Sequence, residues 1–297
     1  MKIQKSQKIK VQGWDLSLNH AAFIELTNGE LSNFWYVTDN TASYRNGKKH
    51  AARFVEPDKL PKEEFGMWRL AWWRGFIDSF LKETFPTVIG LEDYSFSSPM
   101  RSHQIGELGG LARLAIWNSR SLLRLHDPKS VKMFATYNGA AEKPEVEAAI
   151  KDRWDYDFSD FNPPRGKPTA KNPEGRENRQ TSEDLCDAFA IAQLVWMEVQ
   201  LRKGLVNLSD LHAKEIQVFN RTTNTYPVNI LGREFIGRSD ETAEKSGRES
   251  AEEITSIFEE HQRADENKEV EGQPEGVCGA LGGNDDGLQG QLQDNED

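Results

Sequence analysis

Residues 181–197 read TSEDLCDAFAIAQLVWM, and this stretch decides how the rest of the chain is interpreted. Two acids, Asp184 and Asp187, stand three positions apart, and a long apolar run follows them. On a helix, residues i and i+3 lie about 60° apart around the axis, so both carboxylates face one way. Two like charges held together are unfavourable unless a cation or a proton joins them. Thr181 or Ser182 is expected to cap the start of this helix. The plainer interpretation of the two acids is a helix start exposed to water.

The composition predicts one sizeable core followed by an acidic end. The chain has 297 residues, of which 37% are hydrophobic, including 8 Trp and 15 Phe. Residues 239–297 carry 18 acids and 4 Lys or Arg, whereas residues 1–238 carry 30 acids and 33 Lys or Arg. We expect the acidic segment to be a disordered tail, because it is poor in aromatic residues and rich in charge. The remaining part is near neutral to mildly basic, which is compatible with a nucleic-acid partner.

The N-terminal sequence, the apolar runs and the cysteines together predict a reducing compartment. No apolar run approaches membrane-spanning length, so we expect no membrane association. The basic N-terminus has no apolar segment behind it, so no signal peptide is expected. The cysteines are Cys186 and Cys278, which argues against a disulfide framework and for the cytoplasm. Cys186 is expected to be a small buried residue and not a nucleophile.

The hydrophobic pattern predicts strands first and then strands alternating with helices. A strong hairpin signal, Asn28-Gly29, joins the second and third strands. Residues 40–60 and 158–180 are polar and are expected to be loops. Strands are expected over 7–17, 20–27, 30–39, 87–92 and 130–139, and helices over 61–85, 103–124, 142–154 and 181–197. Residues 205–238 suggest a short helix and a hairpin appended to the core.

Acids stand where these elements end. Asp15 ends the first strand, Glu92 ends the fourth, and Asp184 and Asp187 begin the last long helix. A mixed sheet with helices on both faces would bring these ends together. The alternative is that Asp15 and Glu92 are ordinary acids at strand ends.

With these residues in place, the chain resembles the RuvC-type Holliday junction resolvases of the RNase H-like superfamily, particularly those of bacteriophages. The blocks that carry the resemblance are GWDLSLNHAAFIEL (13–26), IGLEDYSFSSPMRSHQIGELGGLARLAIW (89–117), VKMFATYNGAAEKPEV (131–146) and DLCDAFAIA (184–192). The resemblance implies a mixed five-stranded sheet with helices on both faces. It spans about residues 8–203 and predicts a nuclease core over 1–204. The appended segment over 205–238 and the tail over 239–297 lie outside the resemblance. It also implies that the protein works in the cytoplasm of a bacterial cell or of a phage-infected host.

The resemblance also implies roles for individual residues. Asp15, Glu92, Asp184 and Asp187 match the four metal-binding carboxylates of the family. Lys132 and Lys143 match its two functional lysines, for which the plainer interpretation is a solvated surface charge. One departure is Tyr137, where the family has a glycine, and its bulk is expected to alter the approach of the DNA backbone. Either Tyr94 or Phe96 is expected to wedge against bases at the junction, and Arg101 to contact DNA.

These residues imply metal-dependent cleavage of a phosphodiester. Two divalent ions activate a water and stabilise the leaving oxygen, and carboxylates suit Mg²⁺ or Mn²⁺. We expect Asp15 to bridge the two ions and Lys143 to hold the scissile phosphate or offset its charge. No His or Cys cluster has the spacing of a zinc site. Further phosphate contacts are expected from residues 45–53 and 165–179.

Symmetric cutting of a four-way junction calls for a two-fold homodimer. The predicted helix 103–124 contains Gly106, Gly109 and Gly110, which suggests a close approach, either to its own sheet or to a second copy. Leu111, Ile116 and Trp117 are the larger residues expected at such an interface.

Three other functions compete with a junction resolvase. A general branch or flap nuclease, or an RNA-cleaving relative, would use the same acids. A sugar kinase of the actin-like fold also opens with an Asp after its first strand, but it needs glycines where Leu16, Ser17 and Leu18 follow. A non-catalytic DNA-binding relative is disfavoured because clustered carboxylates repel DNA.

Overall fold

The computed structural model describes residues 8–55, 61–93, 102–164 and 178–237. The chain divides into two units, Met1–Arg238 and Ser239–Asp297. The predicted tail therefore lies outside the described residues, and so do Tyr94, Phe96, Arg101 and residues 165–177. No helix among the described residues is both long enough and apolar enough to cross a membrane.

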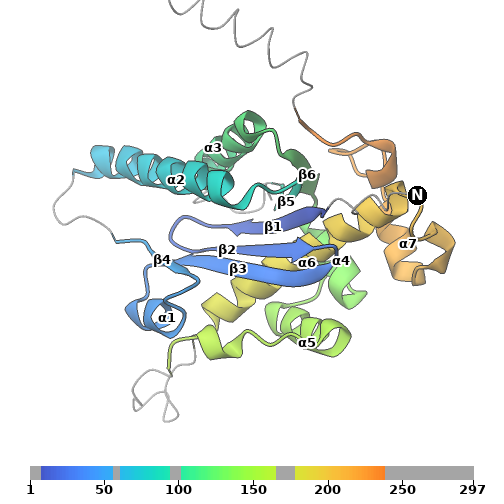
Figure 1. Ribbon diagram of the computed structural model, residues 1–297, viewed down its shortest axis with the longest axis horizontal. Helices are drawn as coiled ribbons and strands as arrows, with labels where there is room; N and C mark the ends of the chain where they lie inside the picture. The colour runs from blue at the N-terminus through green and yellow to red at the C-terminus, as the bar shows by residue number, and fades with distance from the viewer. Residues whose placement is uncertain (1–7, 56–60, 94–101, 165–177, 238–297) are drawn as a thin grey trace, which may run out of the picture. The chain divides into compact units, whose positions relative to one another are not determined.

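A six-stranded mixed sheet forms the centre of the first unit (Figure 1). Its strand order is β4-β3-β2-β1-β5-β6, in which β1, β2 and β3 are antiparallel and β1, β5 and β6 are parallel. The strands are β1 (Lys10–Leu16), β2 (Ala21–Thr27), β3 (Glu30–Thr38), β4 (Ala51–Arg53), β5 (Val88–Glu92) and β6 (Leu122–His126). The mixed α/β fold and the Asn28-Gly29 hairpin are confirmed, since both turn residues have positive φ.

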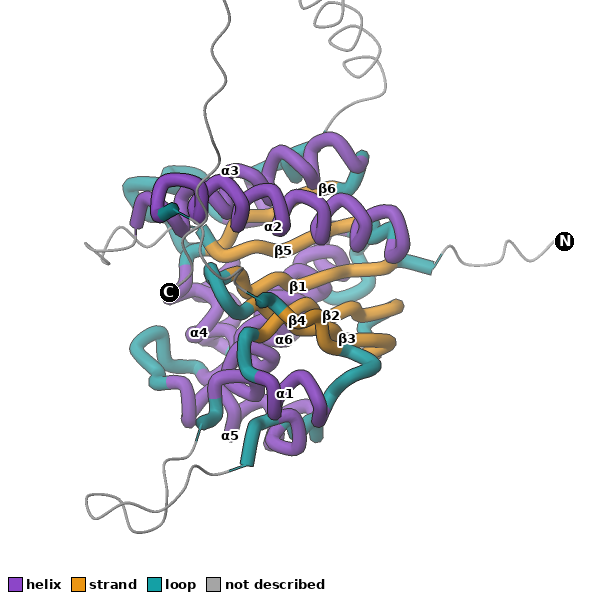
Figure 2. The backbone as a smooth tube through the Cα atoms, turned by 90° about the vertical axis from the view of Figure 1, so that its left-hand side faces the viewer, coloured by secondary structure: helices purple, strands orange, loops and turns teal. Residues whose placement is uncertain are grey.

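Helices cover both faces of the sheet (Figure 2). One face packs against α2 and α3 through the cluster around Trp14, Trp73 and Ile116, and the other packs against α4, α5 and α6. The helices are α1 (Thr41–Asn46), α2 (Lys62–Thr84), α3 (Ser102–Ser119), α4 (Pro128–Thr136), α5 (Lys143–Trp154), α6 (Gln180–Arg202) and α7 (Ala213–Asn220). The aromatic side chains of Trp68, Trp72, Phe76 and Phe80 on α2 pack in this first cluster.

The long helix α6 lies directly on the sheet because two strand residues have no side chain. A Cβ placed on Gly13 of β1 would fall 2.9 Å from Ala192 Cα, and nearer still to the carbonyl oxygen of Ala188. A Cβ on Gly90 of β5 would fall 2.6 Å from a methyl of Val195. Only glycine permits this approach, and the approach sets the distance between the first turns of α6 and the ends of β1 and β5.

Two predicted elements were misplaced. Residues 122–126 form strand β6 and do not continue the preceding helix, and residues 128–136 form helix α4 where a strand was expected. Asp127 caps α4 through the amide of Ser130, and Pro128 occupies the first turn, both of which are helix-start signals. The expected loop over 40–60 contains α1 and the short strand β4, which makes the sheet six-stranded.

The segment 205–237 packs onto the sheet edge and forms no hairpin within its described residues. Its helix α7 packs against α4, and Ile236 makes a single antiparallel bridge with Leu123 on β6. The buried guanidinium of Arg124 lies 2.5 Å from Glu198 and donates to the carbonyl oxygen of Glu234 at 3.1 Å. The appended segment thus accepts a hydrogen bond from a buried guanidinium of the core, and it belongs to the first unit.

Candidate active site

The four predicted carboxylates come from three elements that meet at one end of the sheet. Asp15 lies near the end of β1, Glu92 is the last residue of the adjacent parallel strand β5, and Asp184 and Asp187 lie in the first turns of α6. Asp184 is 6% exposed, and the other three side chains are partly exposed. The close packing at Gly13 holds α6 against β1, so the structure brings all four acids together.

Burial and mutual repulsion raise the pKa of all four carboxylates. Burial, and then the charge of Asp184, raise the pKa of Asp15 to about 7. Burial, followed by Asp15 and Asp187, raises the pKa of Glu92 to about 8. Burial and then Asp15 raise the pKa of Asp187 to about 7, and burial raises that of Asp184 to about 6. Because like charges oppose one another here, the group favours a proton or a cation.

Two lysines supply positive charge to this group. Lys143, the first residue of α5, places its Nζ 3.4 Å from Asp184 and 3.4 Å from Glu183. Burial lowers the pKa of Lys143, but the surrounding acids, Asp184 first, outweigh it and raise the pKa. Lys132 on α4 donates to the carbonyl oxygen of Ala141 at 2.8 Å, and its charge acts on Glu92. Both predicted lysines therefore lie beside the carboxylates.

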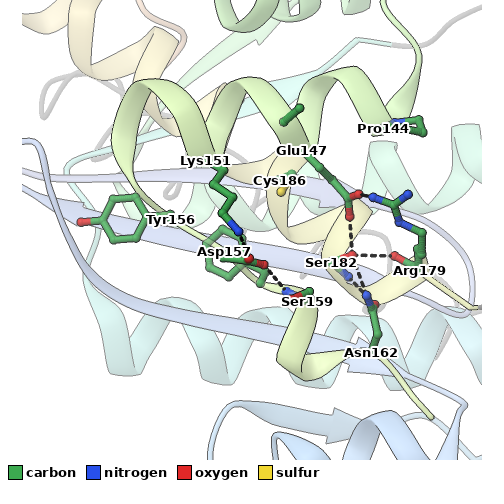
Figure 3. Close-up of a pocket in the computed structure, with 12 residues that line it drawn as sticks. Pro144, Glu147, Lys151, Tyr156, Asp157, Ser159, Asn162, Arg179, Ser182 and Cys186 are labelled. Atoms are coloured by element: carbon green, nitrogen blue, oxygen red, sulfur yellow. Dashed lines mark hydrogen bonds and ion pairs between the residues drawn. The ribbon is translucent and has the colours of Figure 1, made fainter. Parts of the chain in front are cut away.

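The start of α6 is fixed from α5 and from the turn after it (Figure 3). The helix begins at Gln180 and Arg179 gives no side-chain cap, so the expected Thr181 or Ser182 cap is wrong. Instead, the side chain of Asn162 accepts from the amide of Ser182 at 2.9 Å, and the Ser182 hydroxyl donates to Glu147.

Glu147 also forms an ion pair with Arg179, the residue just before α6. The network borders a cavity of about 360 Å³ that Cys186 also lines. Cys186 is 3% exposed, as expected for a small buried residue. The network fixes the first turn of α6 and hence the position of Asp184, to which Gln180 donates at 2.5 Å.

Tyr137 occupies a position with an unusual backbone conformation. It ends α4 with φ of 61°, in the left-handed region where glycine is favoured. Its ring lies 4.0 Å from the ring of His212, and the guanidinium of Arg153 lies 4.6 Å from its centre. Backbone geometry thus gives a reason for a glycine at this position, and the tyrosine packs against protein groups.

Sequence reasoning missed two groups near the carboxylates. His20, in the turn between β1 and β2, places its Nε2 3.4 Å from Asp39, the residue that follows β3. His126 pairs in register with Glu92, is 1% exposed, and has no hydrogen-bond partner on either ring nitrogen. An acid directly after a strand was the only available signal for Asp39, and no sequence signal marks His20 or His126.

The donor set fits a hard divalent cation in its chemistry. Four carboxylates that oppose one another's ionisation are the oxygen ligands that Mg²⁺ and Mn²⁺ take. Within the described ranges, no three Asp, Glu, His or Cys side chains converge closely enough to hold one ion as they stand. The ammonium of Lys143 supplies the positive charge at Asp184 in this arrangement.

No protein-family model matches the chain. No curated protein matches it in sequence. Among solved structures, RuvC of Thermus thermophilus is similar with a TM-score of 0.40 and 16% identity, over 66% of this chain and 97% of that one. RuvC of T. thermophilus in complex with a Holliday junction substrate gives a TM-score of 0.42 and 15% identity over 66% and 96%. The yeast mitochondrial Holliday junction resolvase gives 0.40 and 13% over 66% and 81%.

Proposed function

We propose that this chain is a metal-dependent endonuclease that hydrolyses a phosphodiester in branched DNA, with the four-way junction as its principal substrate. The observation that carries the proposal is the carboxylate group of Asp15, Glu92, Asp184 and Asp187, in which each pKa is raised. Solvent-exposed acids would serve any purely structural role better than four acids gathered beside Lys143. Cation binding gives these four acids a role, and hydrolysis of a phosphate ester is the chemistry that such a metal-binding group supports.

Each residue has a definite task in this proposal. Asp15, Glu92, Asp184 and Asp187 would hold the ions. Two Mg²⁺ or Mn²⁺ ions, when bound, supply an activated water and neutralise the leaving oxygen. Lys143 would exchange its contact with Asp184 for a phosphate oxygen and offset the charge that develops there. Lys132, whose charge acts on Glu92, would serve the neighbouring phosphate.

The test is a cleavage panel with matched acid variants. Asp15→Asn and Asp187→Asn should abolish Mg²⁺-dependent cutting of a synthetic four-way junction while binding persists, because only a ligand is lost. Asp152→Asn is the control, since Asp152 is an exposed acid on α5. Cutting by Asp15→Asn at the wild-type rate would refute the metal-centre proposal. Preferential cutting of a flap, a plain duplex or an RNA–DNA hybrid in the same panel would replace the junction as substrate.

The proposal includes a two-fold homodimer, and α3 offers a surface for it. Leu114 is 52% exposed and Trp117 is 36% exposed, whereas Ile116, expected at the same surface, is fully buried in the core. A Cβ on Gly106 or Gly110 would meet no atom within 4 Å, so packing against its own sheet does not require these two glycines.

Leu114→Glu and Trp117→Glu should therefore turn a dimer into a monomer, as measured by light scattering. A wild-type chain that stays monomeric with junction DNA would refute symmetric cutting. A dimer that persists in both variants would place the interface elsewhere.

A further inference from the structure

A second pocket, of about 290 Å³, is lined by Asp93, the residue that follows Glu92 in the chain. Part of its wall comes from Asp93 and Asp127, which directly follow the parallel strands β5 and β6, and from Lys129 in the first turn of α4. The rest comes from residues 221–226, which lie in the appended segment. Ligands of sheets with parallel strands bind beyond the carboxyl ends of those strands, and this pocket has that position.

The two acids of the pocket wall, Asp93 and Asp127, are already engaged with cations. Asp93 accepts from Arg113 at 2.6 Å and from the hydroxyl of Tyr226. Asp127 lies 3.4 Å from Arg221 and is also the cap of α4. Each acid is therefore matched by a guanidinium, and one of the two, that of Arg221, lines the pocket itself.

Lys129 adds a charge that nothing in the wall balances. It is exposed, and no described residue forms an ion pair or a side-chain hydrogen bond with it. An unpaired ammonium beside a guanidinium, at a pocket whose acids are neutralised, suits an anion.

The appended segment presents its part of the wall in a fixed form. The turn is closed by the amide of Thr223, which donates to the carbonyl oxygen of Tyr226 at 2.8 Å, and by the amide of Tyr226, which donates to Thr223 Oγ1 at 3.0 Å. Arg233 packs on the Tyr226 ring, 4.0 Å from its centre. The exposed residues at the tip, Asn224 and Thr225, add an amide and a hydroxyl, both of which hydrogen-bond phosphate oxygens.

We propose that this pocket binds a backbone phosphate of the DNA strand, next to the phosphate that is cleaved. The proposal rests on the proposed nuclease function. Its chemistry is that of a phosphate contact, which positions the strand without reading sequence. Lys129 and Arg221 are the residues that would make the charged contacts, and the turn 223–226 would supply neutral donors. The appended segment would thereby act as part of the DNA-binding surface beside Glu92.

The experiment measures how salt weakens binding. A fluorescent four-way junction is titrated in EDTA, which prevents cutting, at salt concentrations from about 50 to about 200 mM. In this range, phosphate contacts make the affinity strongly dependent on salt. Each lost contact should lower the slope of log affinity against log salt by about 0.9, for Lys129→Ala and for Arg221→Gln alike. The double variant should lower it by about 1.8. Over this range the wild type should then lose about 3.5-fold more affinity than either single variant.

Lys203→Ala is the matched control, because Lys203 lies with Thr87 and Val88 at the opposite end of β5. A double variant with the wild-type slope would refute the phosphate site, and so would an equal change in Lys203→Ala. The two proposals separate cleanly. If the slope falls as expected but no metal-dependent cutting occurs, the phosphate site stands and the nuclease proposal fails. If the wild type cuts the junction while the slopes are unchanged, the nuclease stands alone, and a chain that binds no DNA refutes both.

Discussion

Replacing Gly13 with alanine should separate the two halves of the carboxylate group. The new Cβ would lie 2.9 Å from Ala192 Cα and closer to the backbone of Ala188, whereas carbon atoms pack at about 3.5–4.0 Å. These neighbours are backbone atoms and cannot rotate away, so α6 must retreat by roughly 1 Å. Overpacking of this kind costs about 3 kcal/mol, which lowers the melting temperature by about 6–12 °C in a unit of this size.

The same displacement should reduce cleavage, because Asp184 and Asp187 move with α6 while Asp15 stays on β1. A misplacement of about 1 Å costs on the order of 100-fold in rate. Thermal melting and junction cleavage of Gly13→Ala measure both effects. Gly75→Ala on α2 is the control, since its Cβ would meet no atom within 4 Å and should stabilise the helix by up to about 1 kcal/mol. A Gly13→Ala protein with wild-type melting and cleavage would refute the packing argument.

Three further predictions concern stability and reactivity. In metal-free buffer the free energy of unfolding should fall as pH rises from about 4 to 7, because the folded pKa of Asp15, about 7, exceeds its unfolded value and the native state binds the extra proton in that window. Denaturation with Mg²⁺ should show a flatter pH dependence, and an equally steep fall in Asp15→Asn would show that Asp15 is not the cause. Arg124→Met should cost about 3–5 kcal/mol in urea unfolding, because it leaves Glu198 buried without its partner, and a loss under about 1 kcal/mol would show that the pair contributes little. In a Cys278→Ser background, Cys186 should resist a thiol reagent at neutral pH until the protein unfolds, because burial raises its pKa to about 12, and fast reaction of the native protein would mean that the thiol is accessible.

Local signals predicted the hairpin and the first turns of α6, because each depends on a few neighbouring residues. The Asn28-Gly29 turn needs only its own backbone conformation, and the Asp184–Asp187 spacing needs only the pitch of a helix. The position of Asp15 and Glu92 at strand ends followed from apolar runs that stop at an acid. Their common location then required only a sheet in which those strands are adjacent.

The failures arose where short apolar runs fit both secondary structures. Residues 131–135 have apolar side chains at spacings that suit a strand or a helix, and the decisive signal was the Asp127-Pro128 cap just before them. Strand β4 is three residues long and forms only because β3 lies beside it. The ion pair between Arg124 and Glu198 joins residues far apart in the chain, so nothing local marks it.

The left-handed conformation of Tyr137 has a consequence for building a shorter version of this chain. Its backbone costs about 1–2 kcal/mol that a glycine would avoid, and part of the compensating contact comes from His212 in the appended segment. A minimal version that ends at residue 204 would keep the cost and lose that ring. Such a version should be redesigned with Tyr137→Gly, whereas in the full chain the same change removes a contact that ties the core to its C-terminal addition.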